Sequence, residues 1–256
     1  MSDTYSTNPR TLGRGICIIT GASKGFGRAL ACEVTHLLDP GSVLLLVARS
    51  GTLLQELKEE LQSFTDQQQL TVHCVAADLS TREGVNETVR MAKHEAVNDI
   101  DHVLLINNAG SLGAISRFES LSDLERVDSY LSFNISSALV LTAGILKTFP
   151  CRPGLRWSVV NISSAFALQA LPSWALYCTA KAARKMMFSV LAEEEPNVKV
   201  LNYSPGPLDT DMQEEIQRLT GISHHLFPCQ ESAAKLMKLL LDNDFSSGAH
   251  HDFFEV

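Results

Sequence analysis

The stretch GICIITGASKGFGRAL, residues 15–30, decides the fold. Its first part, residues 15–20, is a short aliphatic and β-branched run, which is typical of a buried strand. A glycine-rich turn follows, and residues 28–38 then carry apolar side chains at helical spacing. At such a strand–turn–helix junction the backbone can approach a pyrophosphate at a helix N-terminus, so the pattern favours nucleotide binding over a plain tight turn. The glycines of the turn are Gly21, Gly25 and Gly27.

Short aliphatic runs alternate with amphipathic stretches along the rest of the chain, which predicts repeated β-strand–helix–β-strand units. The runs are continuously apolar, as expected for strands whose two faces are both covered by helices. We therefore predict an α/β fold of Rossmann type. It is a single doubly wound, seven-stranded, mostly parallel sheet with helices on both faces, and its ligand binds at the carboxyl ends of the strands. The predicted strands are Gly15–Thr20, Ser42–Ala48, Leu70–Ala76, His102–Asn107, Trp157–Ile162, Lys199–Tyr203 and Ala249–Phe254.

No repeat, low-complexity tract or proline-rich linker divides the chain, so residues 1–256 are interpreted as one domain, with 1–14 as a polar lead-in. Residues 213–230 are the least regular part of the sequence. We predict a substrate flap there, with an ordinary helix-and-loop connection as the alternative. His224 and His225 in this segment are not interpreted as metal ligands, because adjacent side chains on a helix diverge and no third ligand has suitable spacing. No metal is predicted.

The composition excludes several classes of protein. Hydrophobic residues make up 45% of the chain and charged residues 20%, which suits a large core and not a disordered chain. The 21 Lys and Arg against 29 Asp and Glu give a net charge of −8, which argues against a nucleic-acid partner. The longest apolar run, Val43–Ala48, is far shorter than a membrane span of about 20 residues. Without a signal peptide or paired cysteines, we expect a soluble, cytoplasmic protein that does not bind membranes.

Three side chains in the second half of the chain suit carbonyl chemistry. Tyr177 and Lys181 are four residues apart in YCTAK and therefore lie on one face of a predicted helix. Ser164 ends the strand WSVVNISS thirteen residues before Tyr177 and can face the same point. Reduction of a carbonyl needs a hydride and a proton, so Tyr177 is the predicted acid and Ser164 the predicted donor to the substrate oxygen. We expect Lys181 to lower the Tyr177 pKa and to bond the nicotinamide ribose.

The residues after the second strand indicate which dinucleotide would bind. An NAD-specific protein usually has an acidic residue there to bond the adenosine ribose, whereas this chain has Arg49 followed by Ser50. A guanidinium can bind a 2′-phosphate with two hydrogen bonds, and Lys24 in the glycine turn adds positive charge. The predicted cofactor is therefore NADP(H). Arg28 is either a further contributor to this positive charge or a solvated surface cation.

Together these motifs resemble the short-chain dehydrogenase/reductase family over essentially the whole chain. The spacing TGxxxGxG, the pair Asp78-Leu79 after the third strand, the NNAG of residues 107–110 after the fourth and the Y-x-x-x-K pattern all match. The resemblance implies that Asn134 is a fourth catalytic member that holds a water beside Lys181; a helix-interior amide satisfied by backbone is the alternative. The implied cofactor contacts are Gly21, Ala22, Ser23, Lys24, Gly25, Phe26, Gly27, Arg49, Ser50, Asp78, Leu79, Asn108, Lys181, Leu208, Asp209, Thr210, Asp211, Met212 and Gln213.

Within the family, the chain most resembles the members that reduce pterin side-chain ketones in the final steps of tetrahydrobiopterin formation. The resemblance rests on NISS, WALYCTAKAAR, EEPNVKVLNYSPGPLDTDMQ and the terminal SGAHHDFFEV. It implies that Gly206 lines the substrate pocket and that Asp252 binds the pterin, alongside Ser164, Ala165 and Tyr177. One carboxylate can accept both adjacent N–H donors of a 2-amino-4-oxopyrimidine ring. A solvated acid near the chain end is the alternative for Asp252.

Two other functions fit the same motifs. A broad NADPH-dependent reductase of diketones and quinones would share every cofactor and catalytic residue and would differ only at Asp252 and in the flap. The resemblance implies a longer substrate flap, as in the mammalian pterin-reducing members, than the segment between Asp211 and Glu231 provides, and this departure bears on pocket closure and substrate breadth. A catalytically silent NADP-binding sensor belongs to another class, and the intact serine, tyrosine and lysine argue against it. The resemblance also implies a homodimer, formed through the helices that carry Asn134 and Tyr177.

Overall fold

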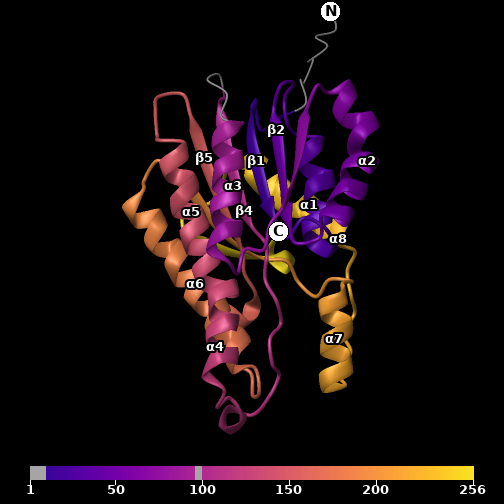
Figure 1. The fold of residues 1–256 in the computed structure, drawn as a ribbon, viewed down its shortest axis with the longest axis vertical. Coiled ribbons are helices and arrows are strands. Elements are labelled where there is room, and N and C mark those ends of the chain that lie inside the picture. Colours follow the sequence, from indigo (N-terminus) through magenta and orange to yellow (C-terminus); the bar gives the residue numbers. More distant parts are fainter. Residues whose placement is uncertain (1–9, 96–99) are drawn as a thin grey trace, which may run out of the picture.

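The fold is a single seven-stranded sheet with helices on both faces (Figure 1). The structure is a computed structural model that describes residues 10–95 and 100–256, so most of the predicted lead-in lies outside the described residues. All strands are parallel, in the order β3-β2-β1-β4-β5-β6-β7, which confirms the predicted fold class. The strands are β1 (Gly15–Thr20), β2 (Val43–Ala48), β3 (Thr71–Ala76), β4 (His102–Asn107), β5 (Arg156–Ile162), β6 (Val198–Ser204) and β7 (Ala249–Asp252).

The predicted strands match the observed ones closely, with one difference at the C-terminus. The last strand ends at Asp252 and not at Phe254, because residues 253–255 turn into a short 3₁₀ helix that the Asp252 side chain caps. The first helix begins at Gly25, inside the glycine turn, and not at Arg28. The α-helices are α1 (Gly25–Thr35), α2 (Gly51–Gln67), α3 (Arg82–His94), α4 (Leu124–Leu131), α5 (Ser137–Thr148), α6 (Ala175–Glu194), α7 (Asp211–Thr220) and α8 (Cys229–Asp242).

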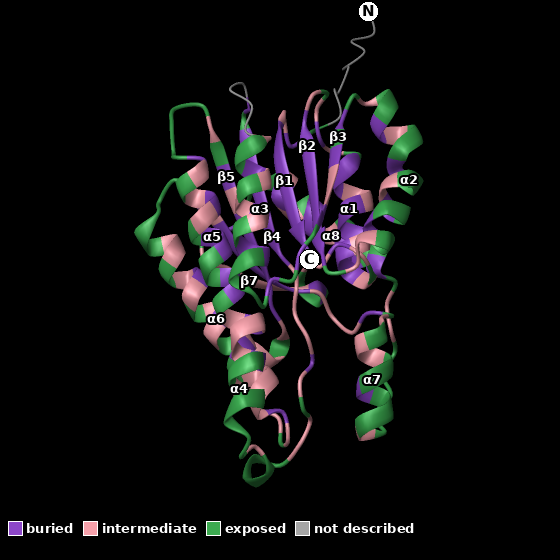
Figure 2. Ribbon diagram, viewed as in Figure 1, coloured by how far each residue is buried: buried purple, intermediate pink, exposed green. Residues whose placement is uncertain are grey.

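Two hydrophobic layers hold the helices to the sheet, which is almost entirely buried between them (Figure 2). One layer packs α1, α2 and α8 against one face, through side chains such as Leu30, Leu57 and Leu236. The other packs α3, α5 and α6 against the opposite face, where Leu141 and Phe188 are buried. Helices on both faces explain why the strands read as continuously apolar runs and not as alternating ones. Because all strands are parallel, their carboxyl ends lie along one edge of the sheet.

Helices α2 and α3 begin at side chains that cap them. The Ser50 hydroxyl accepts a hydrogen bond from the Leu53 N–H at the start of α2, and the Thr81 hydroxyl does the same for Gly84 in α3. Helix α1 differs, because its N-terminal residue Lys24 makes no side-chain cap. Backbone N–H groups in the first turn of a helix have no partner within the helix, so in α1 they are left for a ligand.

One helical run is longer and more apolar than the sequence pattern suggested. Within the described chain, the run Leu124–Thr148 joins α4, a π-helical turn (Ser132–Ser136) and α5, and it is long and apolar enough to cross a membrane. Its inner side chains Leu141 and Ile145 are buried against the sheet in the same layer as α3 and α6. The run is thus a core helix.

A row of polar side chains, three of them buried and the fourth half-buried, crosses the sheet near the carboxyl edge, on the face that α5 and α6 cover. Asn107 of β4 pairs in register with Asn161 of β5, which pairs with Asn202 of β6, which pairs with His250 of β7. The Asn161 Nδ2 donates to Asn202 Oδ1 at 2.9 Å, and Asn107 Nδ2 donates to the Thr142 hydroxyl of α5 at 3.0 Å. We call these four side chains the asparagine row.

At the opposite edge of the sheet, His102 is buried in its neutral form. Its Nδ1 lies 3.2 Å from the Leu12 carbonyl oxygen, which can only accept, so Nδ1 carries the proton. Its Nε2 lies 2.8 Å from the Ser158 hydroxyl. Burial and then the nearby Arg156 charge lower the His102 pKa from 6.5 to about 4, because both disfavour the imidazolium.

This His102 environment predicts a loss of stability in mild acid. Between pH 6.5 and about 4 the unfolded chain binds a proton at His102 that the folded chain does not, so the free energy of unfolding falls as the pH falls. The expected slope is roughly 1.4 kcal/mol per pH unit. Urea unfolding at several pH values measures it. In His102→Gln this contribution of one proton to the slope should disappear. An unchanged slope would contradict the prediction that His102 is neutral in the folded protein.

Candidate active site

The predicted glycine turn lies at the carboxyl edge, where the order of the strands reverses between β1 and β4. Gly21 has a left-handed φ of 67° and lets the chain leave β1 toward α1. A Cβ on Gly27 would lie 2.1 Å from the Gly21 carbonyl oxygen, so only glycine lets the turn close on itself. The Asn108 side chain donates to the Thr20 and Gly21 carbonyl oxygens at 2.9 and 3.2 Å. The loop after β4 thereby fixes the shape of the turn, while Ala22 and Phe26 anchor it in the core.

Two of the three cations predicted near the adenosine end form ion pairs. Lys24 forms an exposed ion pair with Asp211 at 2.5 Å, which joins the glycine turn to the start of α7. Arg28 pairs with Glu60 of α2, so it is engaged away from the turn. Arg49 is exposed after β2, with its guanidinium carbon 6.0 Å from the Phe133 ring centre.

Asp78 and Leu79 follow β3, as the sequence pattern predicts. The Asp78 carboxylate accepts hydrogen bonds from the Ser80 N–H and hydroxyl at 2.9 and 2.7 Å. These bonds lower the Asp78 pKa, and the Arg49 charge adds to the effect. Leu79 is buried beside the carboxyl ends of the strands. The ends of β2 and β3 therefore present a cation and an anion close enough to influence each other.

The predicted catalytic side chains come together at the ends of β5 and α6. Ser164 follows β5; its hydroxyl accepts from the Phe166 N–H at 3.2 Å and lies close enough to the Tyr177 phenol to lower its pKa by hydrogen bonding. Tyr177 and Lys181 lie one turn apart in α6, with the Lys181 Nζ 5.6 Å from the Tyr177 ring centre. The Lys181 ammonium donates to the Ile162 carbonyl oxygen at 2.9 Å. This bond orients Lys181 along the end of β5, next to the phenol.

The pKa of Tyr177 differs from the expectation that its neighbours lower it. Burial raises the Tyr177 pKa; the Ser164 hydrogen bond and, to a smaller extent, the Arg184 charge oppose the rise. Burial, followed by the charge of Arg184, lowers the Lys181 pKa to about 7. The Tyr177 pKa is therefore raised and not lowered in this structure, because desolvation of the phenol outweighs its neighbours, and the expected effect of Lys181 on it stays a prediction.

Asn134 lies in the π-helical turn between α4 and α5 and is buried. Its Nδ2 donates to the Ser111 hydroxyl and to the Tyr130 carbonyl oxygen, both at 3.0 Å, and its Oδ1 accepts from the Ser111 N–H at 2.8 Å. Two of these three hydrogen bonds join the Asn134 amide to backbone groups, as the alternative of a helix-interior amide satisfied by backbone predicts. The amide holds the loop after β4 against the kinked helix, and its role in a water relay stays a prediction.

An aromatic wall stands beside Tyr177. Phe166 and Trp174 contact the Tyr177 ring with centre distances of 6.4 and 5.6 Å, and both meet it edge to face. Met212 and Ile216 of α7 belong to the same apolar cluster. Ala165, a predicted substrate contact, is exposed next to Ser164. Trp174 is buried, so the wall packs the Tyr177 ring firmly in place.

The last predicted substrate residues meet at the end of β7. Asp252 pairs in register with Ser204, and its Oδ1 accepts from the Phe254 N–H at 3.1 Å. The Glu255 carboxylate completes this capping box by accepting from the Asp252 N–H. A Cβ on Gly206, whose φ is 79°, would lie 3.2 Å from the Phe253 ring. Asp252 is therefore held by its neighbours and does not lie on a loose chain end.

The predicted flap contains more regular structure than its sequence suggests. Residues 211–220 form α7, which ends at Gly221 with a left-handed φ of 70°. The chain then returns and pairs Phe227 with Leu208, through hydrogen bonds from the Asp209 N–H to the Phe227 carbonyl and from the Phe227 N–H to the Pro207 carbonyl. The segment 208–213, predicted to cover the nicotinamide, is thus fixed at both ends. Figure 1 shows α7 projecting beyond the carboxyl edge, as α4 does on the other side.

Sequence reasoning missed several groups that contact this site. Arg184 of α6 is buried and donates to the ends of β4 and β5, and the Tyr130 hydroxyl lies 3.3 Å from the Ser111 carbonyl oxygen. His250 bonds the Ser204 hydroxyl at 2.6 Å. The signal for Arg184 was available, since residues 177, 181 and 184 share one helix face. Among residues 10–95 and 100–256, the structure contains no group of three potential metal ligands.

Comparisons with known proteins agree with this geometry. The family profile described as short chain dehydrogenase matches residues 15–220. Sepiapterin reductase of Rattus norvegicus is 47% identical over 260 residues, covering 96% of this chain and 98% of its own, and that of Xenopus laevis is 48% identical, covering 95% and 97%. The solved structure of the Escherichia coli oxidoreductase yciK superposes with a TM-score of 0.79 at 25% identity, covering 98% and 99%. The chain belongs to the short-chain dehydrogenase/reductase family.

Proposed function

We propose that this protein is an NADPH-dependent reductase of pterin side-chain ketones, acting on sepiapterin and 6-pyruvoyl-tetrahydropterin in the final steps of tetrahydrobiopterin formation. The observation that carries the proposal is the convergence of Ser164, Tyr177 and Lys181 at the edge where the glycine turn opens. The near-complete overlap with two sepiapterin reductases supports the choice of substrate.

The residues present fit a dinucleotide. The N-terminus of α1 has no side-chain cap, and Gly27 leaves backbone where any larger residue would collide. When bound, the nicotinamide supplies the hydride. Tyr177 then gives its proton to the carbonyl oxygen of the substrate, and Ser164 holds that oxygen by a hydrogen bond. Lys181, with a pKa of about 7, returns the proton to Tyr177 without a large uphill step.

A preference for NADP(H) follows from the charges around the adenosine end. Family membership supports an NAD(P) cofactor, and the exposed Arg49 after β2 supports the phosphorylated form. In the structure, Lys24 is paired with Asp211 in an exposed ion pair that costs little to exchange for a phosphate. We assign Arg49, Ser50 and Lys24 to the 2′-phosphate.

Asp252 is the proposed anchor of the pterin ring. Its Oδ1 is bound by the Phe254 N–H and its position is set by the pairing of β7 with β6, so the carboxylate is preorganised. The Phe166 and Trp174 rings pack against Tyr177 and fix the phenol toward which the side-chain ketone of the anchored ring would point.

We also infer a homodimer and a cytoplasmic location. Helices α5 and α6 cover the same face of the sheet, and their outer sides expose large apolar residues. Such an apolar surface on two neighbouring helices suits burial against a second copy of the chain. The exposed residues are Leu139, Val140, Met186 and Val190.

Substitution Tyr177→Phe tests the reaction. It removes the proton donor but keeps the ring that packs against Trp174, so turnover of sepiapterin with NADPH should fall at least a hundredfold. The loss of NADPH absorbance measures turnover. Tyr203→Phe is the control, because it removes a buried hydroxyl that bonds Ser232 on the other face of the sheet, and it should stay active. Wild-type turnover by Tyr177→Phe would refute the proposed mechanism.

Substitution Arg49→Asp tests the cofactor. Loss of a charged hydrogen bond to the 2′-phosphate should raise the KM for NADPH roughly tenfold to a hundredfold, and the new carboxylate should improve the use of NADH. Steady-state kinetics with both cofactors measure the change. Arg90→Gln is a matched control, because Arg90 pairs with Glu87 on the surface of α3. An unchanged ratio between the two cofactors would exclude Arg49 from the phosphate site.

Substitution Asp252→Asn tests the substrate. An amide keeps one acceptor for the Phe254 N–H but cannot accept two donors from the pterin, so the KM for sepiapterin should rise roughly tenfold with little change for a small diketone. Glu255→Gln, which alters the other acid of the same capping box, should leave both substrates unaffected. Equal changes for the two substrates would favour a broad carbonyl reductase.

A further inference from the structure

A buried arginine lies one turn beyond Lys181 on the inner face of α6. Arg184 is 2% exposed. Its Nε donates to the Asn161 Oδ1 at 2.8 Å, Nη1 to the Ala109 carbonyl at 2.9 Å and Nη2 to the Asn107 carbonyl at 2.5 Å. All three acceptors are neutral, and they lie at the ends of β4 and β5. A single side chain therefore ties α6 to two strand ends beneath Tyr177.

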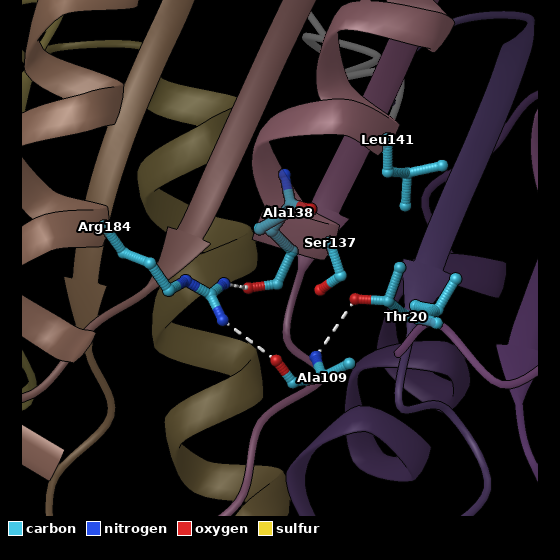
Figure 3. A pocket seen from close by; sticks show the side chains of 8 residues that line it. Thr20, Ala109, Ser137, Ala138, Leu141 and Arg184 are labelled. Atoms are coloured by element: carbon cyan, nitrogen blue, oxygen red, sulfur yellow. Dashed lines mark hydrogen bonds between the residues drawn. The ribbon is translucent and has the colours of Figure 1, made fainter. Parts of the chain in front are cut away.

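The charge of Arg184 has no counterion. No acidic side chain in the described parts of the chain forms an ion pair with it. The gap beside it, bordered by Asn107, Ser137 and Leu141, leaves no room for a water molecule. Figure 3 shows the guanidinium pointing to the Ala109 carbonyl, and the Ala109 N–H bonded to Thr20 of β1. A cation in such a dry setting acts strongly on its neighbours, because little solvent screens it.

Arg184 stays protonated despite its burial. Desolvation lowers its pKa to about 10, partly offset by the Tyr177 and Tyr130 phenols, so it is a cation at neutral pH. The same charge helps to lower the pKa of both Tyr177 and Lys181. For the phenol it favours the phenolate that remains after proton donation, and for the lysine it disfavours a second cation.

We propose that Arg184 is a positioning residue: its guanidinium holds the ends of β4 and β5 next to Tyr177 and Lys181, and its buried, unpaired charge acts on both side chains. The inference rests on the proposed function, in which Tyr177 gives up one proton per turnover and Lys181 replaces it. A buried cation beside the pair stabilises the phenolate that Tyr177 leaves and makes the Lys181 ammonium a readier proton donor, so both proton transfers are favoured.

The other titratable groups around the pair do not supply this charge. Cys178, next to Tyr177 in α6, raises the Tyr177 pKa. Tyr130 of α4, which packs against α6, has its own pKa raised by burial and by the nearby Tyr177, and it is neutral at pH 7. Among the groups that act on Tyr177 and Lys181, Arg184 provides the positive charge, and no carboxylate opposes it.

The test measures Lys181 directly, without turnover. The protein is labelled with ¹³C in its lysines and titrated by NMR, and the Lys181 Cε signal is assigned by its loss in Lys181→Arg. We expect a midpoint of about 7 in the wild type. Arg184→Gln removes the charge and keeps a hydrogen-bonding side chain, so the midpoint should rise by roughly one pH unit or more. Arg156→Gln is the control, because Arg156 also donates to a backbone carbonyl, that of Leu12, but at the opposite edge of the sheet.

A second variant separates charge from hydrogen bonding. Asn161→Asp keeps the guanidinium in place and gives its Nε a carboxylate partner of the same shape, so it should raise the Lys181 midpoint in the same direction. This variant also decides the matter if Arg184→Gln does not fold. A Lys181 midpoint equal to that of the wild type, in folded Arg184→Gln or in Asn161→Asp, would overturn the proposal. If Arg184 had only a structural role, a carboxylate at position 161 that neutralises its charge would not move this midpoint.

The kinetic readout distinguishes this inference from the proposed function. With sepiapterin and NADPH, the alkaline limb of kcat/KM should move to higher pH in Arg184→Gln and Asn161→Asp, because reduction needs protonated Tyr177 and its pKa rises when the cation is lost or neutralised. A limb that stays in place in both variants would overturn the inference. If the wild type reduced no pterin while the Lys181 midpoint still moved, the proposed function would fail and the role of Arg184 in setting proton affinity would stand.

Discussion

The pairing of β1 with both β2 and β4 is the constraint on which the rest of the structure depends. Because the chain leaves β1 for β2 on one side and returns to β4 on the other, the connections diverge and open a crevice at the carboxyl ends of these strands. The glycine turn after β1 and the NNAG loop after β4 face each other across it, joined by the Asn108 side chain. Apart from Lys181 in α6, the predicted cofactor residues lie in the segments that follow the carboxyl ends of strands for this reason.

The architecture was predictable because it depends on patterns that are local in the sequence. Continuous apolar runs such as Val43–Ala48 are recognisable without knowledge of their neighbours, and parallel pairing follows from the helices between them. The spacing of Tyr177 and Lys181 on one helix face, and the place of Ser164 at a strand end, are also local. Their convergence therefore followed from the predicted topology before any distance was known.

The parts that could not be predicted depend on contacts between segments far apart in the chain. Arg184 looks like an ordinary helix cation, and only the burial of α6 against β4 and β5 removes it from solvent. The rise of the Tyr177 pKa has the same origin, since desolvation outweighs the neighbouring donors only when the surrounding helices are in place. Residues 213–230 appeared irregular because the return of Phe227 to Leu208, which orders them, leaves no periodic pattern in the sequence.

The asparagine row has a consequence for how the strands find their alignment. Its members all lie on the face covered by α5 and α6, where Thr142 bonds the Asn107 amide and Arg184 bonds the Asn161 amide. A slip of one residue in β4, β5 or β6 would turn an amide to the opposite face, among the aliphatic side chains of α1 and α8, where it would lack these partners. Hydrophobic strands alone tolerate such shifts more easily. The asparagine row thus disfavours sheets with a shifted strand register, because such sheets would bury amides without hydrogen-bond partners.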